Sequence, residues 1–177
     1  MCEYFHAKRC SSRKSIIFSH AYHQTPDDSC WPSTSEWAIL NDTLSGRLIK
    51  TVPPGSVCYP SQPDYNYAAC QYVITHWTTS AFHSSSPSSV SDPFWSNSSC
   101  TPIYPNGTSL SGDPDARSKG CSLGNLSPYV INATEASHVQ AALKFAKAHN
   151  LRLNIKNTGH NPEKRYETRS HIFNLVH

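Results

Sequence analysis

Residues 127–160, with the sequence SPYVINATEASHVQAALKFAKAHNLRLNIKNTGH, decide the fold. The aromatic and β-branched residues at 129–131 predict a short strand. Thr134 is then expected to cap a helix that runs through Ala148. Apolar residues recur along that segment at i, i+3, i+4 and i+7, as on the buried face of an amphipathic helix. This stripe consists of Val139, Ala142, Leu143 and Ala146.

A second strand is expected directly after the helix. Asn150 suits a helix end in the left-handed conformation. Leu151, Leu153 and Ile155 then alternate with polar residues, which is the period of a half-buried strand. Strand, helix and strand in so short a stretch indicate a βαβ unit or a close relative, and such units bind ligands at the carboxyl ends of their strands.

The loop after this second strand is the candidate binding site. It consists of Asn157, Thr158, Gly159 and His160. A glycine after a strand lets the backbone approach a ligand closely, and free amide hydrogens in such a turn can hold phosphate oxygens. His160 would present its imidazole beside that ligand. Taken alone, Thr-Gly-His is a weak signal, because a histidine in a turn more often only hydrogen-bonds its neighbours.

Two further helices are expected upstream. Residues 33–36, Ser-Thr-Ser-Glu, form a capping box, and Gly46 ends the helix that follows. Its apolar face carries Trp37, Leu40 and Leu44. Asp64 is expected to cap the second helix. Its stripe consists of Ala69, Cys70, Val73 and Trp77, in which Cys70 suits a core position and a disulfide equally well.

Low-complexity sequence separates these helices from the strands. Residues 82–113 are rich in Ser, Pro, Asn and Gly, with the clearest patch at 84–89. This composition predicts loops that cover a surface and are pinned by Cys100 and Cys121.

Composition excludes several classes of protein. The 177 residues suffice for one domain, or one domain and part of another. The net charge of +3 is spread along the chain, which argues against nucleic acid as a partner. No run approaches the roughly 18 apolar residues of a membrane-spanning helix. The set Cys2, Cys10, His20 and His23 fits no common metal site, so no metal is expected.

Cysteines and sequons favour an oxidising compartment. None of the seven cysteines forms a CxxC pair, and disulfides are the expected use of widely spaced cysteines. Asn-x-Ser/Thr sequons lie at Asn41, Asn97, Asn106, Asn125 and Asn132. We therefore expect a secreted protein, although residues 1–20 lack the apolar run of a signal peptide.

Residues 129–160 resemble the opening of the FAD-binding domain of secreted fungal FAD-linked oxidoreductases. These enzymes are berberine-bridge-enzyme-like members of the vanillyl-alcohol-oxidase superfamily with a PCMH-type FAD-binding domain. Residues 30–32, Cys-Trp-Pro, and residues 37–49 are similar to the segment that precedes that domain. The resemblance covers roughly residues 30–160.

The resemblance implies a fold class and a division of the chain. The fold would be α+β, with an amino-terminal helical and loop segment followed by the first βαβ unit of the FAD-binding domain. Residues 1–29 would be a leader, 30–126 the disulfide-bonded segment, 127–160 the start of the FAD-binding domain and 161–177 a divergent tail. That tail lacks the glycines of the family, so the chain is expected to be an incomplete fragment that does not hold FAD alone.

The resemblance also implies a cofactor and residue roles. His160 would be the residue that is joined covalently to the flavin in a full-length form, with Asn157, Thr158 and Gly159 lining the phosphates. The activity would be an FAD-dependent oxidation of a small-molecule substrate, with dioxygen reoxidising the flavin. No catalytic residue is assigned within this chain. The substrate and the oligomeric state are left open.

Two alternatives remain open from the residues themselves. One is a non-catalytic secreted glycoprotein or carbohydrate-binding module, in which Trp77, Trp95 and the tyrosines would form a sugar-stacking surface, although such aromatic residues more often lie in a core. The other is an unfolded fragment without function.

Overall fold

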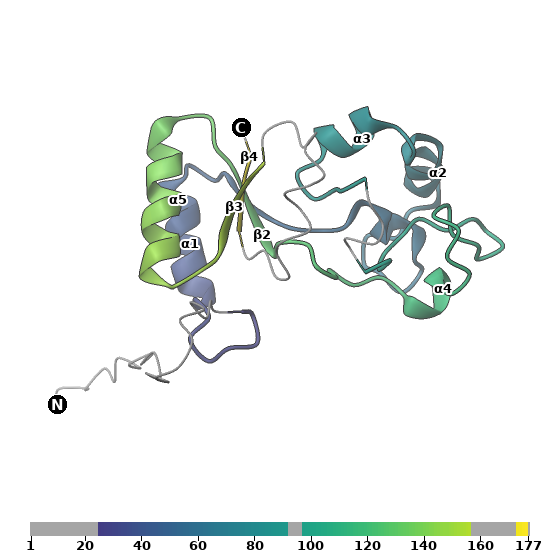
Figure 1. Cartoon of the computed structure of the whole chain (residues 1–177), viewed down its shortest axis with the longest axis horizontal. Helices are drawn as coiled ribbons and strands as arrows, with labels where there is room; N and C mark the ends of the chain where they lie inside the picture. Colours follow the sequence, from purple (N-terminus) through teal and green to yellow (C-terminus); the bar gives the residue numbers. More distant parts are fainter. Residues whose placement is uncertain (1–24, 92–96, 157–172, 177) are drawn as a thin grey trace, which may run out of the picture.

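The computed structural model describes residues 25–91, 97–156 and 173–176. It is an α+β structure in which a four-stranded sheet lies between a pair of helices and a loop-rich region that carries short helices (Figure 1). The strands are β1 (Leu48–Lys50), β2 (Tyr129–Asn132), β3 (Leu153–Lys156) and β4 (Phe173–Val176). The helices are α1 (Thr34–Thr43), α2 (Tyr67–His76), α3 (Ser80–Ser85), α4 (Ala116–Lys119), α5 (Ala136–Ala148) and the 3-10 helix η1 (Pro54–Cys58).

The sheet has the strand order β1-β2-β4-β3. β1 pairs antiparallel with β2, whereas β2, β4 and β3 run parallel. The predicted strand-helix-strand unit is therefore present as β2, α5 and β3, but β4 lies between its two strands. β4 was not predicted from the sequence, although the apolar Phe173, Leu175 and Val176 are a signal that could have indicated it.

The α1 helix begins and ends where the sequence predicted. The Glu36 backbone amide donates to Ser33 Oγ at 3.3 Å, and the Ser33 amide donates to Glu36 Oε2 at 2.6 Å, which completes the capping box. Gly46 follows the helix at φ +78°, a conformation that glycine adopts without strain. Trp37, Leu40 and Leu44 are all buried, so the predicted apolar face of α1 is confirmed.

Glu36→Gln is expected to destabilise the protein at neutral pH but not in acid. Hydrogen bonds from the Ser33 amide, then from the Ser33 hydroxyl, lower the pKa of Glu36 below 4.5. A carboxylate with a lowered folded pKa contributes stability above its unfolded pKa, and this contribution is lost as the pH falls through the folded pKa. Urea unfolding at pH 7 and pH 3 should therefore show a difference between wild type and E36Q that shrinks at pH 3. Asp42→Asn is the charge-matched control on the same helix, and an equal difference at both pH values would contradict the prediction.

The α5 helix departs from the sequence prediction at its start and on its buried face. Glu135, not Thr134, is the N-cap, and it makes no side-chain capping bond. The prediction that Leu143 is buried is wrong, because this side chain is 50% exposed. Ala142 and Ala146 are buried as predicted, and His138 extends their row by one turn. The helix is thus rotated so that Ala141 and Phe145, rather than Leu143, pack against the core. Asn150 has φ +51°, which confirms the left-handed helix end.

One hydrophobic core joins the helix pair to the sheet, and Trp37 lies at its centre. The Trp37 ring stacks on Tyr129 of β2 at a centroid distance of 4.1 Å. It also contacts Phe145 of α5 at 4.8 Å and Trp31 at 5.6 Å. Ile131 of β2 is fully buried in the same cluster. These contacts hold α1 and α5 against the same face of the sheet (Figure 1).

The loop-rich region is an insertion between two neighbouring strands. The chain leaves the sheet after β1 and returns at β2, and the Thr51 amide donates to the Pro128 carbonyl at 2.9 Å across the junction. We call residues 52–127 the disulfide region, because it contains the Cys58–Cys70 and Cys100–Cys121 bridges. These cysteines form a second core with Tyr59, Ile103 and Ala116. Cys70 is therefore both a core residue and a disulfide partner. Cys100 and Cys121, which were predicted to pin the loops, are bonded to each other.

Two sequence predictions within the disulfide region were wrong. Asn66, not Asp64, caps α2, because its side chain accepts from the Ala69 amide at 2.9 Å. Asp64 instead accepts a hydrogen bond from the Ser56 hydroxyl. The serine-rich stretch expected to be loop contains α3, which ends at Ser85. Burial of His83 accounts for this helix, since tertiary contacts outweigh the weak helix propensity of serine.

Candidate functional site

The carboxyl ends of the three parallel strands lie at one edge of the sheet. Asn132 of β2 and Lys156 of β3 both pair with Val176 of β4, so the three strands end in register. Ligands of parallel sheets bind outside this edge, since loops leave the strands there. The candidate loop of residues 157–160 starts immediately after Lys156.

None of the four predicted site residues lies in the part of the chain that the structure describes. Asn157, Thr158, Gly159 and His160 all fall between β3 and β4. Their roles toward a flavin stay predictions. What the structure does establish is the edge of the sheet from which their segment departs.

Arg47 lies at the same edge, next to the end of β2. Its carbonyl accepts from the Asn132 amide at 3.1 Å, which continues the antiparallel pairing of β1 with β2. The Arg47 side chain is half-buried. No described residue forms a hydrogen bond or an ion pair with its guanidinium. A cation held at the carboxyl edge without a protein anion suits a negatively charged ligand. Sequence reasoning did not single out Arg47, because one arginine before a strand carries no pattern.

The turn from β2 into α5 is built around a buried histidine. The Thr134 amide donates to His138 Nδ1 at 3.3 Å, and His138 is 5% exposed. A ring nitrogen that accepts a hydrogen bond carries no proton, so the neutral ring has its hydrogen on Nε2. This bond fixes the start of α5 beside the carboxyl edge. The amide dipoles of α5 then place partial positive charge on the same side of the sheet as Arg47.

A large groove in the described structure runs along the helix pair. It has a volume of about 540 Å³ and runs between α1 and α5. Ile39, 65% exposed, lies on its α1 side, and Lys144 and Ala148 lie on its α5 side. Its lining is mainly apolar, with Glu36 and His149 as an ion pair at 4.0 Å among its polar residues. Nothing in the structure shows what covers it, so we assign it no chemistry.

Among the described residues, the aromatic side chains of the sugar-binding alternative differ in exposure. The Trp77 ring is half-buried, with its centroid 4.9 Å from His83 and 6.0 Å from Phe82. Trp95 lies outside the described residues. Tyr67 and Tyr72 of α2 are exposed at 61% and 59%. Because Trp77 serves the packing of α3, the structure gives this alternative little support.

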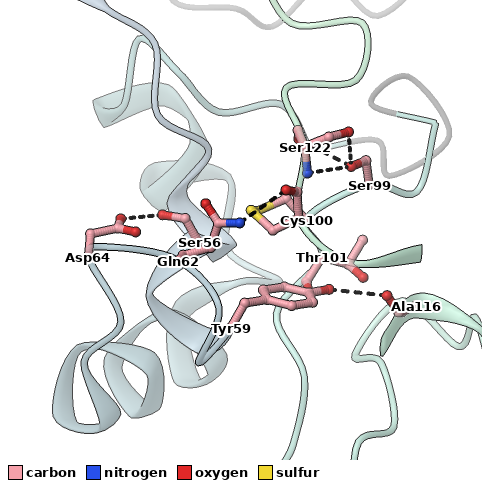
Figure 2. Close-up of a disulfide and its surroundings, with 10 residues drawn as sticks. Ser56, Tyr59, Gln62, Asp64, Ser99, Cys100, Thr101, Ala116 and Ser122 are labelled. Atoms are coloured by element: carbon pink, nitrogen blue, oxygen red, sulfur yellow. Dashed lines mark hydrogen bonds between the residues drawn. A yellow bond between two sulfur atoms is a disulfide. The ribbon is translucent and has the colours of Figure 1, made fainter. Parts of the chain in front are cut away.

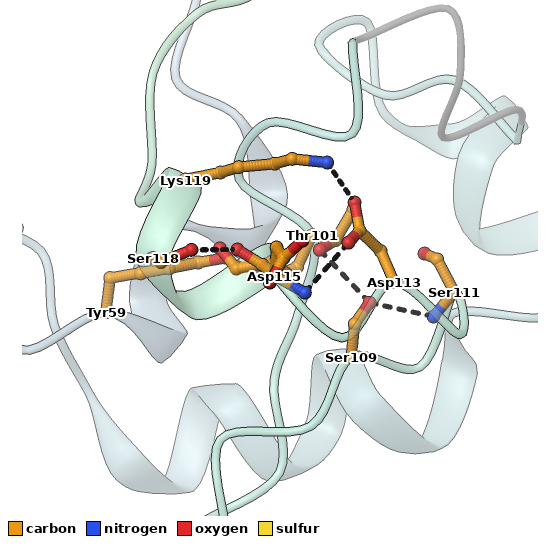
Figure 3. Close-up of polar contacts among 9 residues, drawn as sticks. Tyr59, Thr101, Ser109, Ser111, Asp113, Asp115, Ser118 and Lys119 are labelled. Atoms are coloured by element: carbon orange, nitrogen blue, oxygen red, sulfur yellow. Dashed lines mark hydrogen bonds and ion pairs between the residues drawn. The ribbon is translucent and has the colours of Figure 1, made fainter.

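The polar contacts around the second disulfide support the fold. In Figure 2 the Tyr59 hydroxyl lies beneath Cys100, and it donates to the Thr101 carbonyl at 2.7 Å. Burial raises the pKa of Tyr59, so this phenol stays protonated and remains a donor. In Figure 3 Lys119 reaches Asp113, and the hydrogen bond from Lys119 lowers the pKa of that carboxyl group. Most of the donors and acceptors shown pair with one another, whereas the Ser111 hydroxyl in Figure 3 is buried without a hydrogen-bond partner among the described residues.

Among the described residues no group of three or more histidine, cysteine or acidic side chains is placed to hold a metal ion. Within the same part of the chain, no helix has the length and hydropathy needed to cross a bilayer.

The chain is similar to fungal flavoproteins, although no family model matches its sequence. It is 43% identical over 135 residues to an FAD-linked oxidoreductase of Gibberella zeae. It is 45% identical over 137 residues to a VAO-type flavoprotein oxidase of Thermothelomyces thermophilus. Each alignment covers 76% of this chain and 22% of the relative. The chain thus spans about a fifth of the length of these relatives.

A solved structure agrees with the sequence comparison. The crystal structure of a VAO-type flavoprotein from Myceliophthora thermophila matches 87% of this chain with a TM-score of 0.72 and 40% identity. The match covers 26% of that protein. The α+β fold inferred from sequence is therefore confirmed as that of a segment of VAO-type flavoproteins.

Proposed function

We infer that this chain forms one wall of the FAD site in an oxidoreductase of the fungal VAO type, the family in which its relatives lie. The observation that carries the proposal is the carboxyl edge at which β2, β4 and β3 end in register. In the sequence, residues 157–160 directly follow Lys156, the last residue of β3. The relatives named above are an FAD-linked oxidoreductase and a VAO-type flavoprotein oxidase, which supports FAD as the ligand.

The groups at this edge fit the diphosphate of FAD. Arg47 is a half-buried residue without an anionic partner among the described residues, and the positive end of the α5 dipole lies at the same edge. We propose that Asn157, Thr158 and Gly159 add backbone amides to this positive edge. His160 would hold the flavin ring, through a covalent bond in the complete enzyme.

In the proposed mechanism, the residues of this chain bind FAD and orient it. FAD, when bound, supplies the ring that accepts a hydride from an organic substrate and passes the electrons to dioxygen. Arg47 would neutralise diphosphate charge, while the Thr134–His138 bond keeps the start of α5 in place. A neutral imidazole at residue 160 is nucleophilic, and it must be held rigidly to attach to the ring. The residues that contact substrate would lie in parts of the enzyme that this chain does not match.

A graft tests the proposal. Residues 25–160 would replace the matched segment of the Thermothelomyces oxidase, and the purified chimera would be denatured in acid to separate free from protein-linked flavin. We expect protein-linked flavin in the chimera and its loss in the His160→Ala variant, since Ala has no nucleophilic nitrogen. Leu143→Ala, which changes an exposed side chain of α5, is the matched control and should keep the flavin.

Two outcomes would contradict the proposal. One is a folded chimera that holds no flavin at all, and the other is an unchanged amount of linked flavin in His160→Ala. The isolated chain supplies one wall only, and large cofactors need walls on both sides. Equilibrium dialysis of the 177-residue chain against FAD is therefore expected to show no retained flavin.

A further inference from the structure

We propose that Asn106 is an N-glycosylation site, and that the hairpin around it is shaped to carry the glycan outward. The contacts that favour Asn106 do not involve the flavin site, and only the exclusion of Asn132 rests on the proposed function. Five sequons occur in the chain. They differ in the exposure and hydrogen bonds of the asparagine and of the hydroxyl group two residues later. Asn106 is the one at which both groups suit a glycan.

The Asn106 side chain is ordered by its own sequon. The Thr108 hydroxyl donates to Asn106 Oδ1 at 2.7 Å, and the Thr108 amide donates to the same oxygen at 3.0 Å. Both bonds use the amide oxygen, so Nδ2, the atom that carries an N-glycan, is left without a hydrogen-bond partner in the described structure. Asn106 and Thr108 are both exposed. A sugar on Nδ2 would therefore enter solvent without breaking any of these bonds.

The turn that presents Asn106 is rigid. The Gly107 amide donates to the Tyr104 carbonyl at 2.8 Å, and the Tyr104 amide donates to the Thr108 carbonyl at 2.9 Å. Gly107 has φ +84°, and the Arg117 side chain lies directly behind it, so a Cβ at this position would meet Arg117. The turn is thus packed on one side and open on the side of Asn106.

The base of the hairpin is fixed to the rest of the disulfide region. Figure 3 shows Ser109 between Thr101 and Ser111, with hydrogen bonds of 3.2 Å and 3.0 Å. Thr101 follows Cys100, which is bonded to Cys121. A glycan at Asn106 would extend from this support without disturbing either disulfide.

The other sequons are less suitable in the folded chain. Asn41 is half-buried, and its Oδ1 accepts from the Leu48 amide at 3.0 Å at the start of β1. The Ser127 hydroxyl of the Asn125 sequon is buried. In the Asn97 sequon, the Ser99 hydroxyl pairs with Ser122 instead (Figure 2). Asn132 is exposed but lies at the carboxyl edge of the sheet, where a glycan would cover the proposed flavin site.

The chemistry requires one external reactant, an oligosaccharide linked to a polyprenyl diphosphate. Nδ2 of Asn106 attacks the anomeric carbon of the first sugar, so a C–N bond forms. The bond from that carbon to the diphosphate oxygen breaks, and polyprenyl diphosphate leaves. The transferring enzyme takes the displaced amide proton. No oxidation or reduction occurs, and the disulfides of this chain fit the compartment in which this transfer takes place.

Peptide mapping tests the proposal. The 177-residue chain would be expressed in yeast behind a cleavable secretion signal and purified under denaturing conditions from cells and medium together. Glycans would be released by peptide N-glycosidase in ¹⁸O-labelled water, which marks each formerly glycosylated asparagine as labelled aspartate. We expect the label at Asn106 in most molecules, and little or none at Asn41 or Asn125.

Variants make the assignment specific. Asn106→Gln and Thr108→Ala should each remove the glycan from this peptide, because either change destroys the sequon. Thr108→Ser keeps the hydroxyl and should retain it. An unlabelled Asn106 beside labelled Asn41 or Asn132 would overturn the proposal, and so would an unlabelled Asn106 with no label elsewhere. Because the measurement is a peptide mass, it does not depend on flavin binding.

Discussion

Gly55→Ala is expected to disrupt the disulfide region, with a loss of about 3 kcal/mol or more in the free energy of unfolding. Gly55 is buried in η1, where its backbone packs against that of Cys100. A Cβ on residue 55 would overlap the Cys100 carbonyl oxygen and lie 3.1 Å from the carbonyl carbon and 3.2 Å from Pro102 N. All three atoms are backbone, so no side chain can swing aside to relieve the overlap.

Urea unfolding and free-thiol titration measure this effect. Separation of η1 from Cys100 should also hinder formation of the native bridges, so Gly55→Ala should show more free thiols after oxidative refolding. Gly112→Ala is the matched control, because residue 112 has φ +76° and open space around its Cβ position. That change adds only backbone strain of roughly 1–2 kcal/mol. Equal losses of unfolding free energy in the two variants would refute the role of the close contact between Gly55 and Cys100.

Trp37→Ala is expected to cost about 3–5 kcal/mol in the free energy of unfolding, the usual cost of removing a large buried aromatic ring. Trp37 is 4% exposed, and it joins α1 to Tyr129 of the sheet and Phe145 of α5. Its removal leaves a cavity where three elements meet. The helix pair should then detach from the sheet more readily than the disulfide region unfolds.

Hydrogen exchange with mass spectrometry shows whether Trp37→Ala destabilises only the helix pair or the whole protein. In Trp37→Ala, amides of α1 and α5 should exchange faster, while those of the disulfide region change little, because Cys58 and Cys100 lie in a separate core. Ile39→Ala, at a 65% exposed position of the same helix, should change stability by at most about 0.5 kcal/mol. A uniform increase in exchange across both cores would contradict the local model.

Local patterns predicted the elements whose signals are contained in a few neighbouring residues. The capping box from Ser33 to Glu36 fixed the start of α1, and the left-handed Asn150 marked the end of α5. In each case the deciding hydrogen bonds or backbone conformation lie within one turn of the chain. The same locality explains why β2 was found from residues 129–131.

Features that depend on distant contacts were missed. Leu143 has the correct spacing for a buried stripe, but the position of α1 decides which side of α5 is covered. Asp64 is a good helix cap in isolation, yet Ser56 from η1 binds it and leaves the role to Asn66. The position of β4 between β2 and β3 is likewise a long-range pairing that sequence periodicity does not encode.

At the candidate site, sequence reasoning predicted the strand that precedes residues 157–160 but did not single out Arg47. The strand before Asn157 was found, which located the loop. Arg47 was missed because its place beside Asn132 follows from the pairing of β1 with β2, two segments far apart in the chain. The roles of Asn157, Thr158, Gly159 and His160 stay predictions.

The junction at Thr51 and Pro128 makes β1 and β2 the two arms of a single hairpin whose loop is the entire disulfide region. Because the two ends of that loop are hydrogen-bonded to each other, changes in its length need not alter the register of the sheet. We therefore expect insertions and deletions in the disulfide region to have little effect on the carboxyl edge of the sheet. This architecture lets one part of the molecule diversify while the other is kept constant.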